Sequence, residues 1–98
     1  MSKFLEIINQ NKPVLIDFFA DWCGPCKTMS PILKDVKRVL GDKVSIIKIN
    51  VDKNQSLAAK YQVRGVPTFL LFKEGKQIWR QSGIIQKEEL LNIISKNN

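Results

Sequence analysis

The arrangement of apolar and polar residues predicts an alternation of helices and strands. Residues 14–19 and 44–51 are two short runs that are almost wholly apolar, which is typical of strands covered on both faces in a parallel or mixed sheet. Residues 68–73 and 76–81 predict two further strands, joined by a tight turn at Glu74-Gly75. The pattern therefore predicts two buried strands followed by a hairpin.

Helical spacing of apolar residues marks most of the remaining chain. Ser2 is placed to cap the first helix, and Gly41 is placed to end the second. The loop at 63–67 is broken by glycine and proline. The helices are expected at residues 2–10, 23–40, 55–61 and 87–95. The order α-β-α-β-α-β-β-α predicts a single α/β domain over residues 1–98, with helices on both faces of a central mixed sheet.

Composition narrows the class of protein. A chain of 98 residues is one small domain, and it holds no apolar run of the length that crosses a bilayer. Its first ten residues do not resemble a signal peptide, so we expect a cytoplasmic protein without membrane contact. The net charge of +7 comes from sixteen scattered basic residues without a nucleic-acid motif, so no nucleic-acid partner is expected.

Both cysteines of the chain lie in one hexamer, Trp22-Cys23-Gly24-Pro25-Cys26-Lys27, where a strand gives way to a helix. Two thiols at this spacing can close and reopen a small disulfide ring, which predicts a redox-active pair. Two other interpretations stay open. One chain has no histidine or third cysteine to complete a metal site, but two chains together could hold zinc or an iron–sulfur cluster. A purely structural disulfide would gain little from so short a loop.

The sequence resembles the thioredoxin family along essentially its whole length. The matching positions are Asp17, Trp22 to Lys27, Pro31, Lys48, Val66-Pro67-Thr68, Gly75 and Gly83. The resemblance implies a thioredoxin-like three-layer α/β/α fold with a central mixed sheet of about four strands. It also implies a monomeric, cofactor-free and metal-free reductase of disulfides in client proteins. Its implied partners are those clients and a flavin-dependent thioredoxin reductase that uses NADPH.

Two other functions are open to a protein with this fold. Thioredoxin-fold oxidants and isomerases usually carry a histidine between the cysteines, whereas this chain has Gly24 and Pro25 there. A binding module or partner subunit with incidental redox activity is the alternative from another class. The intact hexamer and Asp17 argue against that alternative, and turnover of an insulin-like disulfide would separate the two.

The two cysteines are expected to have different roles. A thiolate is the attacking species, and unpaired N–H groups at a helix N-terminus stabilise it. Cys23 precedes the helix and is expected to be the exposed nucleophile, whereas Cys26 lies about one turn further in and resolves the mixed disulfide. Gly24 and Pro25 set the tight geometry between them.

Two ionisable residues interrupt the apolar strands. Asp17 has apolar neighbours on both sides, so burial should raise the pKa of its carboxyl. By resemblance, this carboxylate lies under the site and exchanges a proton with the resolving thiol. Lys48 interrupts the next strand, and its ammonium could approach Asp17 or simply be solvated at a strand end.

The resemblance also implies a surface for clients. The Val66–Pro67 peptide bond would be cis and would hold the Val66 backbone ready to pair with an extended substrate. Trp22, Pro25, Val66 and Gly83 would form a flat apolar patch around the nucleophile.

The chain departs from the family pattern in three ways. It begins almost directly in the first helix, whereas family members usually have a strand before it, so we expect a four-stranded sheet with an exposed edge. Phe19 stands where many members have a second tryptophan. The chain is basic, whereas many bacterial members are acidic.

Overall fold

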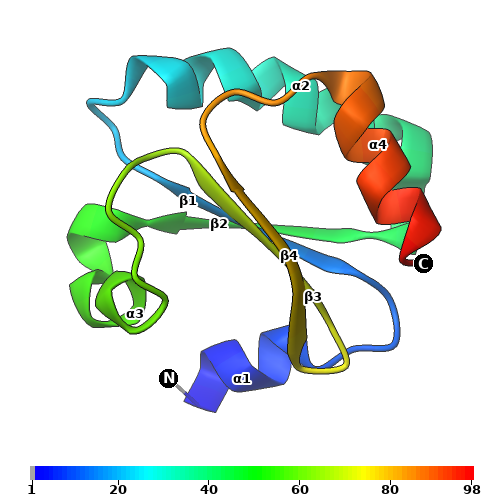
Figure 1. Cartoon of the computed structure of the whole chain (residues 1–98), viewed down its shortest axis with the longest axis horizontal. Coiled ribbons are helices and arrows are strands. Elements are labelled where there is room, and N and C mark those ends of the chain that lie inside the picture. Colours follow the sequence, from blue (N-terminus) through cyan, green and yellow to red (C-terminus); the bar gives the residue numbers. More distant parts are fainter. Residues whose placement is uncertain (1) are drawn as a thin grey trace.

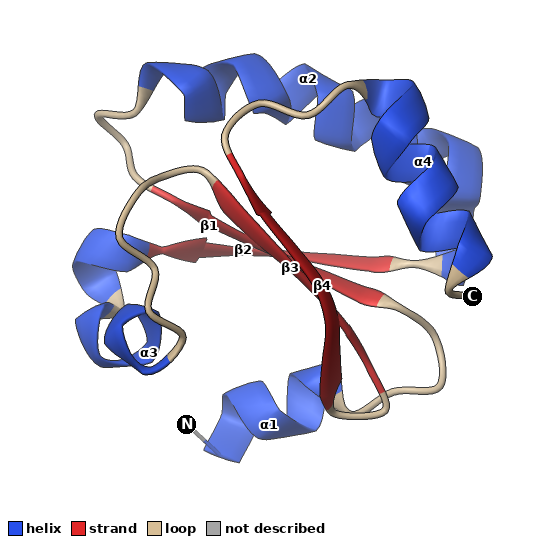
Figure 2. Ribbon diagram, in the orientation of Figure 1, coloured by secondary structure: helices blue, strands red, loops and turns tan. Residues whose placement is uncertain are grey.

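A four-stranded mixed sheet forms the centre of the fold, in the order β2-β1-β3-β4 (Figures 1 and 2). The computed structural model describes residues 2–98, without the side chain of Ser2, so the expected Ser2 cap lies outside the described part. The strands are β1 (Val14–Phe19), β2 (Ser45–Asn50), β3 (Thr68–Lys73) and β4 (Lys76–Ser82). Strands β1 and β2 are parallel, and the other two pairs are antiparallel. The expected mixed sheet of four strands is confirmed.

Helices cover both faces of the sheet, as Figure 2 shows. They are α1 (Ser2–Ile8), α2 (Gly24–Leu40), α3 (Gln55–Lys60) and α4 (Lys87–Lys96). Helices α2 and α4 lie on one face, and α1 and α3 lie on the other (Figure 1). Two short 3₁₀ helices that the sequence pattern did not predict flank β2, namely η1 (Gly41–Lys43) and η2 (Val51–Lys53). The expected three-layer arrangement is confirmed.

Successive side chains of β1 point to opposite faces of the sheet, and each set packs against a different pair of helices. Leu15 packs with Met29 and Leu33 of α2, whereas Ile16 packs with Phe4 and Ile8 of α1. Every residue of β1 except Phe19 is buried, because β1 lies between two strands and between two helical layers. The prediction of a central strand covered on both faces is confirmed for β1.

The same prediction is wrong for β2. Ile46 and Ile47 are only partly buried and Lys48 is exposed, although residues 44–51 are strongly apolar. The reason is that β2 pairs with β1 alone and forms one edge of the sheet. An apolar run does not distinguish a central strand from an edge strand that packs its faces under helices.

Local conformation accounts for where the elements end. Helix α1 stops at Ile8, two residues earlier than predicted. Gly41 ends α2 with a φ of 55°, in the left-handed region that glycine adopts without steric cost. Glu74 and Gly75 both have positive φ, which gives the hairpin between β3 and β4 the twist that a tight turn needs.

Candidate active site

Cys23 and Cys26 form a disulfide at the N-terminus of α2. Cys23 is the N-cap residue, with Gly24 and Pro25 beginning the first turn behind it. The Cys23 Sγ accepts a hydrogen bond from the backbone N–H of Cys26, with a distance of 3.1 Å. The same N–H, at the positive end of the helix dipole, is positioned to stabilise a thiolate on Cys23 when the disulfide is open.

Burial of the two sulfur-bearing residues corrects one expectation. Cys23 is only 3% exposed and Cys26 is 8% exposed, so the prediction of an exposed Cys23 is wrong for the disulfide form. Both pack with Ala20 in a small cluster, against which Val51 and Val66 also lie. The disulfide is therefore largely covered by apolar neighbours.

Trp22 stands out from that surface. It is 70% exposed, although its indole N–H donates a hydrogen bond of 2.9 Å to the carboxylate of Asp52. Trp22 and Val66 both line a hollow of about 90 Å³, together with Val51 and Gly65. Two residues of the expected apolar patch, Trp22 and Val66, thus share one hollow.

The loop before β3 is held by hydrogen bonds to the end of β4. The Val66–Pro67 peptide bond is cis, as the resemblance implied. The Gly83 N–H donates to the Pro67 carbonyl with a distance of 2.8 Å, and the hydroxyls of Thr68 and Ser82 lie 2.9 Å apart. Gly83 has a φ of 90°, a conformation that an L side chain rarely adopts, so glycine suits this contact.

Asp17 is buried on β1, on the same face of the strand as Leu15. It is 2% exposed, and its Oδ1 has no hydrogen-bond partner among the described residues. Burial raises the pKa of the Asp17 carboxyl to about 6, and the positive charge of Lys48 opposes part of that rise. Lys48 is the register partner of Asp17 in the parallel pair of β1 and β2. The expectations that Asp17 is buried and that Lys48 lies beside it both agree with this geometry.

Lys48 is held on the α2 side of the sheet. Its ammonium donates a hydrogen bond of 3.3 Å to the Ser30 hydroxyl and lies 5.2 Å from the centre of the Phe19 ring. Cys26 lines a hollow of about 150 Å³ together with Ser30 and Lys48. Lys48 therefore connects the surroundings of Asp17 to a hollow that Cys26 also lines.

Comparison of the sequence with known families shows which family this chain belongs to. The thioredoxin family model matches residues 1–96. The chain belongs to the thioredoxin family. Thioredoxin of Rickettsia felis is 41% identical over 92 residues, which cover 94% of this chain and 88% of that protein. Chloroplastic thioredoxin Y of rice is 45% identical over 94 residues, which cover 95% of this chain and 56% of that protein.

Solved thioredoxin structures agree with the fold. A mutant thioredoxin from Halobacterium salinarum superposes with a TM-score of 0.89 at 36% identity, covering 99% of this chain and 84% of that one. Mitochondrial thioredoxin 3 of Saccharomyces cerevisiae, in its oxidised form, gives 0.87 at 35% identity and covers 97% and 88% of the two chains. With its closed pair of cysteines, this member of the family is a thiol–disulfide oxidoreductase that acts as a protein-disulfide reductase.

Sequence reasoning missed two contacts that complete this thioredoxin site. Asp52 accepts the hydrogen bond from Trp22, thirty residues away, and Ser30 accepts the hydrogen bond from Lys48. Neither has a local signal, since each looks like an ordinary polar residue beside a strand or on a helix.

Within residues 2–98 no cluster of three or more potential metal-ligating side chains is found. None of the described helices is both long and apolar enough to span a membrane.

Proposed function

We propose that this thioredoxin reduces disulfide bonds of client proteins and is itself recharged by an NADPH-dependent, flavin-containing thioredoxin reductase. The observation that carries the proposal is the Cys23–Cys26 disulfide at the start of α2, with the Cys26 N–H directed at the Cys23 sulfur. The two sulfurs store one pair of electrons, which is what a disulfide reductase must deliver in each cycle.

The chemical steps follow from these positions. In the reduced protein the Cys23 thiolate attacks one sulfur of the client disulfide and expels the other as a thiolate, which forms a mixed disulfide. The Cys26 thiolate then attacks the Cys23 sulfur and expels the second client thiolate. Two electrons have moved to the client, and the Cys23–Cys26 bond has formed again.

Asp17 serves the second step in this proposal. The Cys26 thiol must lose its proton before it can attack, and a carboxyl group with a pKa of about 6 is mostly ionised at neutral pH and so able to accept that proton. The charge of Lys48 favours the ionised form of Asp17. Burial and charge thus support Asp17 as the group that takes the proton, with Lys48 tuning it.

Clients are proposed to bind across the patch formed by Trp22, Pro25, Val66 and Gly83. The exposed Trp22 and the hollow beside Val66 support an extended client segment that pairs with the Val66 backbone. The proposal includes a cytoplasmic location, where a reducing pool would keep the cysteine pair active. Fractionation of cells that express the tagged protein at its natural level tests that location.

The experiment that tests the cysteine roles is a trapping assay with matched variants. Reduced Cys26→Ser lacks the resolving thiol and should accumulate mixed disulfides with client proteins, which are released by dithiothreitol. Cys23→Ser lacks the proposed nucleophile and should accumulate almost none. Equal trapping by the two variants would contradict the assignment. Both variants should also fail to reduce insulin. The wild-type protein, supplied with NADPH and a thioredoxin reductase, should reduce it with turnover.

A further inference from the structure

Strand β4 directs the side chain of Arg80 toward the end of α3. Arg80 lies opposite Leu70 in the antiparallel pair of β3 and β4. Leu70 packs in the part of the core that α1 and α3 cover, and residues opposite each other in a sheet share a face. The neighbouring Trp79 packs on the α2 and α4 side, as the alternation of side chains along a strand requires.

The Arg80 guanidinium donates hydrogen bonds to two successive backbone carbonyls. Its Nη1 donates to the Tyr61 carbonyl, and its Nη2 donates to the Gln62 carbonyl with a distance of 2.9 Å. Both carbonyls come directly after α3, where the helix has no further N–H groups to pair with them. The planar fork of an arginine side chain fits two neighbouring acceptors, which a lysine ammonium does not match.

The two carbonyls flank a residue in an uncommon conformation. Gln62 has a φ of 54°, in the left-handed region that residues other than glycine rarely adopt. The Tyr61 ring before it packs in the core, and the Val63 N–H after it donates a bond of 2.9 Å to the Ala58 carbonyl. Arg80 therefore holds the point at which the chain reverses direction after α3.

This reversal begins the segment that carries Val66, whose backbone is proposed to pair with clients. Within residues 2–98, Val66 makes no backbone hydrogen bond of its own. Gly65 is exposed and Val66 is only half-buried, so packing alone holds this backbone weakly. The position of Val66 therefore depends on how residues 61–67, here called the cis-proline loop, are fixed at their two ends.

Strand β4 holds both ends of the cis-proline loop. At the far end, the Thr68 hydroxyl donates to the Gly65 carbonyl with a distance of 2.7 Å and lies 2.9 Å from the Ser82 hydroxyl. Ser82 follows Arg80 by two residues, so the two side chains share a face of β4. We propose that Arg80 is a positioning residue of the reductase, which clamps the start of the loop and presents the Val66 backbone preformed to protein clients, an inference that rests on the proposed pairing of clients with Val66.

The clamp has a specific kinetic consequence. A client that pairs with a preformed loop does not have to order that loop when it binds, whereas without the clamp the cost of ordering falls on binding. Arg80 makes no contact with Cys23, Cys26 or Asp17 that would alter the exchange step. Loss of Arg80 should therefore raise the client concentration that half-saturates the reaction and leave the maximal rate unchanged.

The test measures single-turnover oxidation of the pre-reduced protein, so that the recharging reductase plays no part. Insulin is the protein client, and hydroxyethyl disulfide is a small neutral client without a peptide backbone. Arg80→Met should raise the half-saturating insulin concentration about fivefold, since the loop must now be ordered on binding. Its maximal rate should stay within about twofold of wild type, and its rate with hydroxyethyl disulfide should be unchanged.

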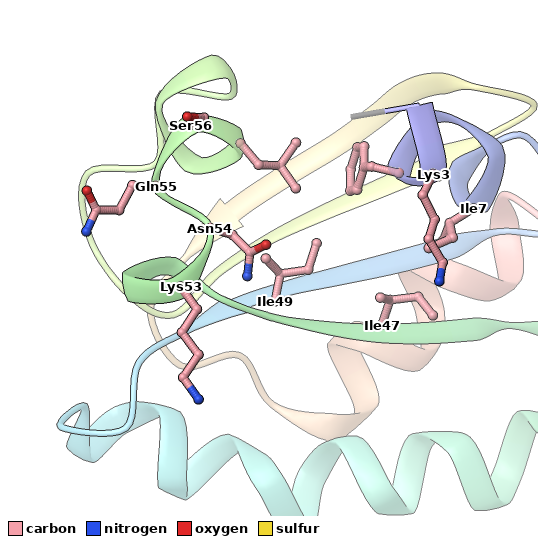
Figure 3. Close-up of a pocket in the computed structure, with 10 residues that line it drawn as sticks. Lys3, Ile7, Ile47, Ile49, Lys53, Asn54, Gln55 and Ser56 are labelled. Carbon is pink, nitrogen blue, oxygen red and sulfur yellow. The ribbon is translucent and has the colours of Figure 1, made fainter.

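Two matched variants separate geometry from charge. Arg80→Lys keeps the positive charge without the fork, so its half-saturating insulin concentration should stay above that of wild type. Lys3→Met removes one positive charge from α1, beside a hollow of about 460 Å³ that residues of α1 and α3 line (Figure 3), and should behave as wild type. Amide hydrogen exchange at Val63 should be faster in Arg80→Met and unchanged in Lys3→Met, because the Val63 N–H reports on the reversal after α3.

Three outcomes would overturn the proposal. The first is an unchanged half-saturating insulin concentration in Arg80→Met, and the second is an equal loss with insulin and hydroxyethyl disulfide, which indicates general damage. The third is full wild-type behaviour of Arg80→Lys, which would make charge the cause. If the wild type itself does not reduce insulin, the proposed function fails, and exchange at Val63 then decides separately, since unchanged exchange in Arg80→Met overturns the clamp.

Discussion

The buried carboxyl of Asp17 should make the stability of this thioredoxin fall as pH rises. Its pKa in the folded protein is about 6, against an ordinary value of 3.8. Because the pKa is raised by folding, the folded chain binds more protons than the unfolded chain between these values. The contribution of neutral Asp17 to stability is therefore complete below pH 4 and is lost as pH rises through 6.

The magnitude follows from the same difference. One pKa unit corresponds to about 1.4 kcal/mol, so the difference of about two units between the folded and unfolded chain corresponds to about 3 kcal/mol of unfolding free energy. That is a large share of the ~5–15 kcal/mol that holds a small domain. No large discount for solvent screening applies, because Asp17 is only 2% exposed.

The assay compares wild type with Asp17→Asn, in the oxidised form, by guanidinium unfolding across pH 3.5 to 8. The stability of wild type minus that of the variant should fall by about 3 kcal/mol over this range. Asp35→Asn is the control with the opposite sign. The hydrogen bond from Arg38 lowers the pKa of the exposed Asp35 carboxyl, so Asp35 contributes stability that is lost on acidification. A difference for Asp17→Asn that does not change with pH would refute the reasoning.

Three further predictions concern turnover and packing. Asp17→Asn should slow release of the client from the mixed disulfide by roughly 10²-fold and remove a titration near pH 6 from stopped-flow rates; an unchanged pH–rate profile contradicts its role. Trp22→Ala should lower kcat/KM for protein clients by roughly tenfold without changing Tm, because the ring is 70% exposed; a large loss of Tm contradicts this. Leu15→Ala should cost about 2–5 kcal/mol in denaturant unfolding, against under about 0.5 kcal/mol for the half-exposed Leu5→Ala; similar costs contradict the core assignment.

Much of the fold could be predicted from the sequence because its signals are local. Gly41, the Glu74-Gly75 turn and the apolar run of β1 each act within a few residues, and the elements they predict are present. The position of β2 at the edge of the sheet could not be predicted from such local signals. Whether an apolar strand is central depends on which strands pair with it, and that is a property of the whole sheet.

The site shows the same division. The cysteine pair and the buried Asp17 could be predicted, because both depend on neighbours in sequence. The burial of Cys23 could not, since Val51 and Val66 that pack beside it come from distant segments. The hydrogen bond between Trp22 and Asp52 likewise joins the turn after β1 to η2, which only the folded sheet brings together.

Sheet order explains why these distant loops meet. Strands β1 and β3 are antiparallel neighbours with Phe18 opposite Thr68, so the end of β1 and the start of β3 lie together. Thr68 also lies opposite Ser82 of β4, which brings the segment after β4 to the same end of the sheet. The disulfide, the cis-proline loop and Gly83 therefore share one end of the sheet.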